Sequence, residues 1–355
     1  MRKSPHFIKK VANLTMHNSI VAVKPFNHPK FFRNGLFNTA NDPKLRIFIT
    51  LREYLKKHGY DLVTIDMPQA IHAQALIVLD VPYPWDLVSW FYIFRNIHHS
   101  ILFHWEPPII NPFNYMKAIM PIFRCIYTSN DMLVDGNKFK KFYYPKTDTG
   151  FIRKKIPFAK KKLVTMVASN LSVFLPFQLL ARSSELYSTR QKIVAFFDRY
   201  APREFDLYGR GWNKPARFSI RDRLIGFRSY VTYRGACKDQ FKVLSRYRFG
   251  ICLENTDAPG YLCEKMFDCF KAGSVPVYLG AINIADIVPK NCFIDMRDFR
   301  TNGDLLAFLR LIDETTYDAY LTNIRQFLRK SETKMRWFEY GFAKLVLGAV
   351  RAIDV

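Results

Sequence analysis

Residues 246–299 constrain the fold of this chain more than any other segment of its sequence. Two short apolar runs, at 249–253 and 275–279, have the length and composition of buried strands. Between them lie a polar turn and a helical pattern that opens at Tyr261. Strand, loop, helix and strand in this order form the repeating unit of a parallel α/β sheet. Because anions bind beside helix N-termini at the carboxyl edge of such sheets, we expect an anion-binding crevice here.

The alternation of strands and helices continues through most of the chain, whose 355 residues are enough for two domains with separate cores. Further apolar runs predict strands at 19–23, 61–65, 75–79, 101–103, 163–168 and 204–208. Helical patterns predict helices at 42–58, 184–200, 238–247, 304–312, 315–329 and 334–350. A stretch at 146–162 that mixes Lys, Pro and Gly follows neither period and has the composition of a linker.

We therefore predict an α/β fold of two facing Rossmann-like domains with a cleft between them. The predicted boundaries are 1–155 for the N-terminal domain, 156–333 for the second domain and 334–355 for a C-terminal helix that packs back. Glu106 and Glu264 would then lie on opposite walls of the cleft.

The formal net charge of +24 predicts attraction to an acidic partner. Basic residues cluster at 138–141, 153–155 and 160–162. Nucleic acid, an anionic membrane, a phosphorylated glycan and a nucleotide-sugar all fit, and a solvated basic surface is the alternative for any single cluster. No basic motif with interleaved aromatic residues and no recognition helix occurs, so we expect no nucleic-acid partner.

The six cysteines contain no C-x-x-C pair, and all eight histidines lie in the first 104 residues, which predicts free thiols and no structural metal. The basic start Met1-Arg2-Lys3 is not followed by the apolar region of a signal peptide. The apolar stretches at 87–94 and 173–181 are too short to span a bilayer. We expect a cytoplasmic protein in which these two stretches could contact a membrane surface.

Two residues have the chemistry of a transfer site. Glu106 follows a buried strand and precedes two prolines, which hold its carboxylate on a stiff turn. Trp105 lowers the local polarity and would raise the pKa of Glu106 toward that of a general base. Arg190 lies on a predicted helix, and its planar guanidinium suits a diphosphate. A solvent-exposed position is the alternative interpretation for both side chains.

Glu264 and Lys265 lie in the first turn of the helix that opens at Tyr261. The carboxylate can accept hydrogen bonds from sugar or ribose hydroxyls, and the ammonium can bind a phosphate oxygen beside the helix N-terminus. Glu254 and Asn255 follow the preceding strand and add polar groups at the same crevice. The favourable interaction of a carboxylate with a helix N-terminus would by itself also explain Glu264. Tyr261 could flank a nucleotide base or ribose, or it could be a core aromatic residue.

These residues carry a resemblance to a known family. The pattern Y-R-F-G-I-C-L-E-N-T-x(4)-Y-L-C-E-K-M-F-D-x(4)-G-S-V-P-V-Y-L-G, with F-I-D-M-R-D-F downstream, resembles the donor-site signature of the alpha-1,3/1,4-fucosyltransferases, glycosyltransferase family 10. The match extends to V-A-S-N at 167–170, to F-D-L-Y-G-R-G-W at 205–212 and to H-W-E-P-P-I-I-N-P-F-N-Y at 104–115. Leu253 and Cys263 replace the usual phenylalanine and threonine, which affects packing rather than chemistry.

The resemblance implies a GT-B fold, GDP-fucose bound by the second domain, and an inverting transfer to an acceptor on the side of the N-terminal domain. It implies that Glu106 is the catalytic base. Donor contacts are implied for Asn170, Arg190, Tyr208, Glu254, Asn255, Tyr261, Glu264 and Lys265. The implied acceptor is an oligosaccharide or a lipid-linked glycan, such as O3 of GlcNAc or Glc in a surface-glycan or lipopolysaccharide precursor. The chain resembles the soluble bacterial members, which could contact an anionic membrane peripherally.

No D-x-D motif occurs in the chain, so arginine, lysine and helix N–H groups must meet the charge of the leaving group. We therefore expect that no metal cofactor is required, although a loosely held divalent ion could still stimulate the reaction. Three alternatives stay open. They are the same fold with another GDP-sugar donor, a non-enzymatic nucleic-acid binder suggested by charge alone, and a catalytically inactive glycan-binding relative.

Overall fold

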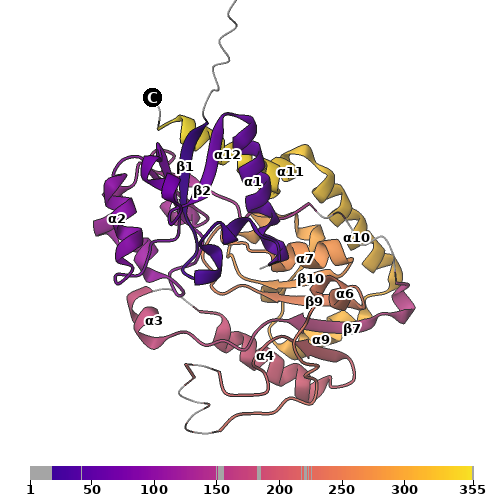
Figure 1. Ribbon diagram of the computed structural model, residues 1–355. Helices are drawn as coiled ribbons and strands as arrows, with labels where there is room; N and C mark the ends of the chain where they lie inside the picture. The colour runs from indigo at the N-terminus through magenta and orange to yellow at the C-terminus, as the bar shows by residue number, and fades with distance from the viewer. Residues whose placement is uncertain are drawn as a thin grey trace, which may run out of the picture.

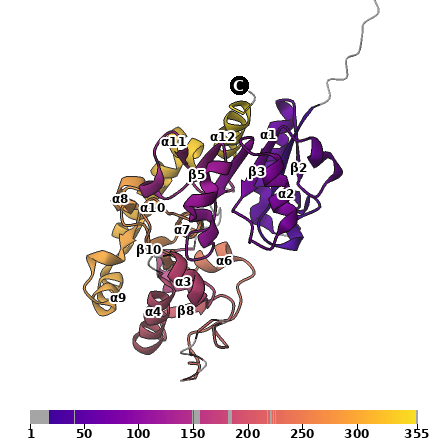
Figure 2. The ribbon, with the colours of Figure 1, turned by 90° about the vertical axis from the view of Figure 1, so that its left-hand side faces the viewer.

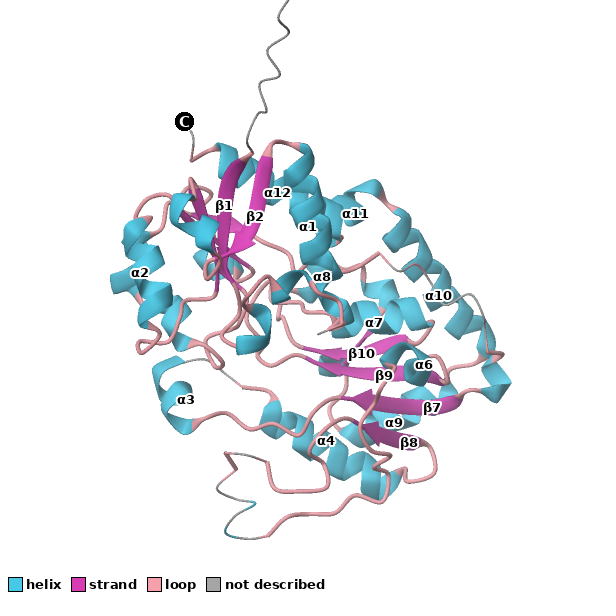
Figure 3. Cartoon of the chain, viewed as in Figure 1, coloured by secondary structure: helices cyan, strands magenta, loops and turns pink. Residues whose placement is uncertain are grey.

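The structure is a computed structural model that describes residues 18–40, 42–148, 150, 156–181, 185–216, 218, 219, 222, 224 and 226–353. Within these residues the chain forms two α/β domains that lie against each other, each built on its own sheet (Figures 1 and 3). The N-terminal Met1-Arg2-Lys3, the basic cluster at 153–155 and Ser184 lie outside the described residues.

The N-terminal domain is built on a sheet of six parallel strands in the order β2-β1-β3-β4-β5-β6. The strands are β1 (Ser19–Lys24), β2 (Tyr60–Thr64), β3 (Ala75–Leu79), β4 (Ser100–His104), β5 (Cys125–Thr128) and β6 (Phe139–Lys141). β3, β4 and β5 are buried along their whole length, as is typical of parallel strands covered on both faces. Helix α1 (Arg46–Lys57) covers one face, and Ile93 of α2 (Leu87–Arg95) packs on the other.

The second domain contains a parallel sheet in the order β11-β10-β9-β7-β8. Its strands are β7 (Lys162–Val167), β8 (Phe205–Tyr208), β9 (Tyr247–Leu253), β10 (Val275–Leu279) and β11 (Ile294–Asp295). Its helices include α3 (Leu175–Ala181), α4 (Tyr187–Tyr200), α6 (Gln240–Leu244), α7 (Lys265–Ala272), α8 (Ile284–Ile287), α9 (Asn302–Leu311), α10 (Glu314–Arg329) and α11 (Ser331–Trp337). One continuous apolar core lies between this sheet and its helices.

The last helix, α12 (Glu339–Arg351), returns to the N-terminal domain and packs against α1 (Figure 2). The chain passes between the domains at Lys146 and again at Trp337–Glu339, and these two crossings are hydrogen-bonded to each other. The N–H of Lys146 donates to the carbonyl oxygen of Trp337 at 2.6 Å, and the N–H of Glu339 donates to that of Lys146 at 3.1 Å. The Lys146 ammonium lies over the rings of Tyr144 and Phe267, at 5.4 Å from each centroid, which is a cation–π geometry.

The predicted fold of two facing α/β domains with a returning C-terminal helix is confirmed. Details differ at three places. The predicted helix 334–350 is broken at Phe338, where the crossing pairs with Lys146. The helix predicted from Tyr261 begins at Lys265. The predicted boundary between residues 333 and 334 falls inside α11, whose Trp337 is part of the second domain's core.

The sequence did not predict β5, β6, β11, α2, α3 or α8. No helix within the described ranges combines the length and hydropathy needed to cross a membrane.

Candidate active site

The carboxyl edge of the second sheet opens into a cavity of about 440 Å³. Its walls come from the ends of β7 and β9, the loop after β8 and the start of α7. Gly209 permits these loops to converge, because its φ is +134° and a Cβ there would lie 1.9 Å from the carbonyl oxygen of Ala168. The cavity occupies the place where the sequence predicts an anion-binding crevice.

Arg190 projects from α4 to the wall of this cavity, and its side chain is almost fully buried. One Nη donates to the carbonyl oxygens of Leu253 and Glu254, each at 3.3 Å. The Nε of Arg190 has no hydrogen-bond partner. A buried guanidinium with an unused donor favours an anionic ligand such as a diphosphate. Its burial contradicts the alternative of a solvent-exposed helix arginine.

A buried carboxylate beneath the cavity positions Lys265. Glu254 has no solvent exposure, and its two oxygens accept from the N–H of Cys263 at 3.0 Å and from the Cys263 thiol at 2.5 Å. Lys265 Nζ donates to the same carboxylate at 3.2 Å. Burial lowers the pKa of Lys265, but the neighbouring Cys263, Glu254 and Glu264 together outweigh burial and hold the pKa well above its usual value. Lys265 therefore presents a permanent positive charge at the cavity wall.

Glu264 immediately precedes α7 and also lines the cavity. Its carboxylate pairs with Lys44 of the N-terminal domain, at 3.1 Å between Oε1 and Nζ. Burial raises the pKa of Glu264, but Lys44, Lys265 and Lys146 outweigh burial and hold the pKa below its usual value. Both partners of the Lys44 pair are partly exposed, so the pair contributes little stability and can be exchanged for a ligand.

Glu106 lies in the N-terminal domain, on the turn after β4, and is half-buried. Burial raises the pKa of Glu106 to about 8, the charges of Asp80 and Glu264 add to this rise, and Lys265 opposes it. Glu106 thus lies within electrostatic reach of two cavity residues from the other domain. A carboxyl group with this pKa can accept a proton near neutral pH.

Asp80 is a residue of this site that sequence reasoning missed. Its Oδ1 accepts from the N–H groups of Trp105 and Glu106, at 2.8 and 2.9 Å, and from Asn114 Nδ2 at 2.6 Å. Asp80 is almost fully buried and has a φ of +61°, an uncommon conformation for a residue other than glycine. Lys24, also buried, donates to the Asp80 carbonyl oxygen at 3.1 Å. The available sequence signal was that Asp80 directly follows β3, as Glu106 follows the end of β4.

Three other predicted donor residues direct their polar atoms to neighbouring protein groups. Asn170 Nδ2 donates to the carbonyl oxygen of Gly211 at 3.1 Å. The Tyr208 hydroxyl lies 3.3 Å from that of Tyr247. The buried Tyr261 ring packs edge-on against Tyr144 of the N-terminal domain, with centroids 5.6 Å apart. The structure therefore brings Arg190, Asn255, Glu264 and Lys265 to the cavity wall, whereas Glu106 is not among the lining residues and interacts electrostatically with Glu264 and Lys265. It leaves Asn170, Tyr208, Glu254 and Tyr261 in supporting contacts.

The turn that ends in Pro259-Gly260 packs directly against the N-terminal domain. The N–H of Asp131 donates to the carbonyl oxygen of Pro259 at 2.9 Å. Gly260 has a φ of +79°, and a Cβ there would lie 2.4 Å from the carbonyl oxygen of Ser129. Glycine is needed here because two backbones from different domains meet.

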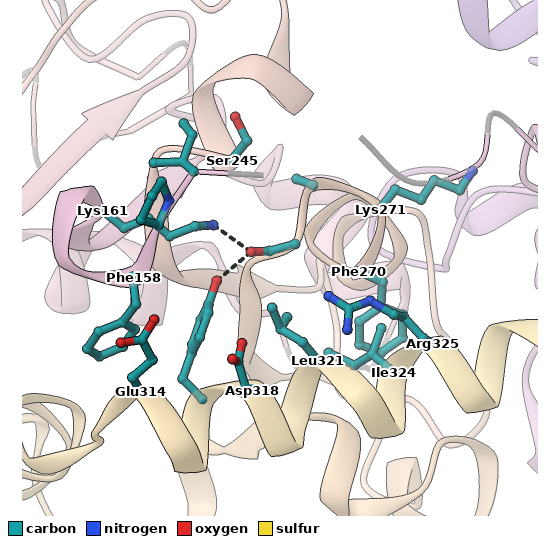
Figure 4. A pocket seen from close by; sticks show the side chains of 15 residues that line it. Phe158, Lys161, Ser245, Phe270, Lys271, Glu314, Asp318, Leu321, Ile324 and Arg325 are labelled. Atoms are coloured by element: carbon teal, nitrogen blue, oxygen red, sulfur yellow. Dashed lines mark hydrogen bonds between the residues drawn. The ribbon is translucent and has the colours of Figure 1, made fainter. Parts of the chain in front are cut away.

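A smaller cavity of about 230 Å³ lies beside α10 (Figure 4). Lys161 Nζ and the Tyr317 hydroxyl both donate to the carbonyl oxygen of Gly273, at 2.7 and 2.6 Å. They cap the C-terminal end of α7, and burial lowers the pKa of Lys161 to about 8. Because these donors are already satisfied by the helix end, we do not assign this cavity to the site.

No group of three or more His, Cys, Asp or Glu side chains within the described ranges is arranged to hold a metal ion. Charge at the cavity comes instead from Arg190, Lys265 and the first turn of α7.

Comparison with known proteins gives a family match over the second domain. Residues 159–343, more than half of the chain, match the family model described as "Glycosyltransferase family 10 (fucosyltransferase) C-term". The chain is 37% identical over 79 residues to an alpha-(1,4)-fucosyltransferase of Arabidopsis thaliana, covering 22% of this chain and 20% of that protein. It is 33% identical over 95 residues to the Helicobacter pylori alpha-(1,3)-fucosyltransferase FucT, covering 26% of this chain and 19% of that protein. The matches thus span about a fifth of these relatives.

Solved structures show the same fold over nearly the whole chain. A crystal structure of an alpha1,3-fucosyltransferase superposes with a TM-score of 0.59 at 14% identity, covering 98% of this chain and 93% of that one. Anabaena Alr3699/HepE in complex with UDP and glucose superposes with a TM-score of 0.55 at 12% identity, covering 95% of this chain and 100% of that one. The expected GT-B fold is confirmed by these neighbours.

Proposed function

The chain belongs to glycosyltransferase family 10, and on this basis we propose that it transfers L-fucose from GDP-fucose to a hydroxyl of a glycan acceptor. The observation that carries the proposal is a cavity lined by the cations Arg190 and Lys265, with a carboxyl group of the other domain within electrostatic reach of it. That group is Glu106, whose pKa is about 8.

On the donor side, Arg190 and Lys265 bind the diphosphate and stabilise its charge as it leaves. Their cationic groups are held before substrate arrives, by the carbonyl oxygens around Arg190 and by Glu254 beneath Lys265. Fixed charges need little reorganisation during the reaction, which is the physical basis of their effect. In this proposal Glu264 accepts hydrogen bonds from sugar or ribose hydroxyls once the donor displaces Lys44. Asn255, which lines the same cavity, contributes an amide to these contacts.

On the acceptor side, Glu106 removes the proton of the acceptor hydroxyl. The oxygen attacks the anomeric carbon from the face opposite GDP as the bond between that carbon and the phosphate oxygen breaks. The proton stays on Glu106 and the electron pair of the broken bond leaves with GDP, so the anomeric centre inverts. The transition state has oxocarbenium character, as in inverting glycosidases.

The acceptor we propose is O3 of a GlcNAc or Glc unit in a surface-glycan or lipopolysaccharide precursor, entering from the N-terminal domain. The proposal includes peripheral contact with an anionic membrane at the inner face of the plasma membrane. The net charge of +24 supports this contact, because anionic lipid attracts clustered lysine and arginine. No metal is required in this scheme, because the cavity cations take the role that a divalent ion has elsewhere.

The test is turnover of GDP-fucose by the purified protein with lactosamine acceptors, with the product linkage read by NMR. A panel of other GDP-sugars assayed beside it measures donor choice. We expect fucosyl transfer that persists in the presence of EDTA. Absence of transfer from GDP-fucose, with transfer from another GDP-sugar, would contradict the donor assignment.

A further inference from the structure

Helix α2 exposes its apolar side to solvent. Leu87 is 75% exposed, and Phe91 and Phe94 are each 55% exposed, whereas only Ser89 and Ile93 of this helix are buried. A helix on the surface of a globular domain ordinarily turns its apolar stripe toward the core. The outward stripe of α2 therefore stays unsatisfied within the domain, and exposed apolar patches of this kind mark interaction sites.

Helix α3 of the second domain adds apolar residues on the same side of the molecule. Leu175 and Leu179 of this helix, and Leu171 just before it, are exposed. In Figure 1 both helices lie on the left side, and both face the viewer in Figure 2. A series of rings links them: Phe113 lies 6.1 Å from Tyr83, which precedes α2, and 6.0 Å from Phe177 of α3. We call the exposed side chains of Leu87, Phe91, Phe94, Leu171, Leu175 and Leu179 the α2–α3 face.

The charges around α2 select one kind of partner. Between residues 81 and 130 the acidic residues are Asp86 and Glu106. Asp86 caps α2 by accepting from the N–H of Ser89 at 3.1 Å, and Glu106 belongs to the candidate active site. Arg95, Lys117 and Arg124 are all exposed in the same stretch. Exposed apolar and aromatic side chains beside cations, without free carboxylates, match an anionic lipid surface.

We propose that the α2–α3 face inserts into the headgroup region of an anionic bilayer. It assigns a surface to the membrane contact of the proposed function and does not depend on the reaction. The face is formed by outward-pointing side chains of two helices from two domains, and a planar membrane can contact both helices at once. Aromatic side chains are favoured at the depth of lipid headgroups.

This orientation brings the acceptor wall close to the membrane. The 3-10 helix at Pro112–Tyr115 carries Phe113, which links the two helices, and Tyr115, whose hydroxyl donates to the carbonyl oxygen of Glu106 at 3.3 Å. The turn that holds Glu106 is therefore joined to the α2–α3 face by one short helix. A glycan anchored in the same bilayer by a lipid would reach Glu106 without leaving the membrane surface.

The experiment is co-sedimentation of the full chain with vesicles of equal parts phosphatidylcholine and phosphatidylglycerol, at low and high salt. Vesicles of phosphatidylcholine alone are the lipid control. The test variant is Phe91→Ser/Phe94→Ser, and the matched control is Leu311→Ser/Met335→Ser, at exposed positions on α9 and α11 of the second domain. We expect the test variant to lose about tenfold or more in vesicle partitioning, because burying even one phenylalanine changes partitioning by about this factor. The control variant should bind like the wild type.

The proposal would be overturned if the test variant sediments with the vesicles as the wild type does. It would also be overturned if the wild type does not bind vesicles even at low salt. Sedimentation-velocity data showing that the test variant only dissociates a dimer, with vesicle binding unchanged, would overturn it as well. Turnover with a soluble acceptor should be the same in all variants, since neither pair lines the donor cavity. A wild type that binds vesicles but transfers no fucose, together with a test variant that no longer binds vesicles, would support the membrane contact and contradict the proposed reaction.

Discussion

Replacing Asp80 by Asn should move the acidic limb of the pH–rate profile to lower pH. Asp80 Oδ1 accepts three hydrogen bonds that hold the turn of Glu106, and an Asn side chain retains an oxygen at that place. The substitution removes a negative charge that, after burial, contributes most to raising the pKa of Glu106. Glu264 would still raise this pKa and Lys265 would still lower it.

The size of the effect follows from the pKa of about 8 for Glu106. At pH 7 such a group is ionised in roughly one molecule in ten. Removing a nearby like charge lowers a pKa by about 1 unit or more. Glu106 would then be ionised in about half of the molecules, a gain of roughly fivefold in active base at pH 7. Above the new pKa the maximal rate should fall, because a weaker base accepts the proton less readily.

The assay is kcat/KM for GDP-fucose and a saturating soluble acceptor as a function of pH, with GDP affinity and circular dichroism as controls for folding. Asp318→Asn, which changes an exposed carboxylate on α10, is the matched charge control and should leave the profile unchanged. An acidic limb at the wild-type position in a folded Asp80→Asn protein would refute the electrostatic role of Asp80.

Substitutions at three further positions test the site. Glu106→Gln should keep GDP affinity by calorimetry and lose about 10²–10⁴ in turnover; wild-type turnover would remove Glu106 from the mechanism. The same variant should gain stability over the wild type as pH rises from 4.5 toward 8, because the raised pKa of Glu106 favours folding only while it is protonated; a constant difference in thermal midpoint would contradict that pKa. Arg190→Lys should weaken GDP binding by about tenfold, because an ammonium cannot reproduce the guanidinium fork, and unchanged affinity would argue against a diphosphate contact. Cys263→Ala should cost about 1–3 kcal/mol in unfolding experiments by removing a donor to buried Glu254, whereas Cys263→Thr should stay near the wild type.

Much of the fold could be predicted because its central strands are covered on both faces. β3 and β10 match their predicted ranges, and β9 contains the predicted apolar run 249–253. β6 could not be found in this way, because Phe139–Lys141 is half-exposed and two of its residues are lysines. α2 was missed for a different reason. Several of its apolar residues face solvent, so their spacing does not follow the pattern of a helix with one buried side.

The candidate site was predictable in its residue types but not in its contacts. The sequence could not decide whether Arg190 is exposed, because that depends on the carbonyl oxygens of Leu253 and Glu254 from a distant strand. It placed Glu254 at the crevice, whereas the fold buries that carboxylate under Cys263 and Lys265. The sequence could not show that Asp80 accepts a hydrogen bond from the N–H of Glu106, because the two residues follow different strands and meet only in the folded structure.

The hydrogen bonds between the Lys146 and Trp337–Glu339 crossings are one of several places where the two domains are joined. The turn at Pro259-Gly260 is another, since its backbone is hydrogen-bonded to that of Asp131. A body held at two separate points cannot swing freely about either of them. Lys44 and Glu264 line a cavity together with Lys146, so their ion pair lies beside one of these joints. A nucleotide would therefore enter by displacing the Lys44 side chain from Glu264, without a large rotation of one domain against the other.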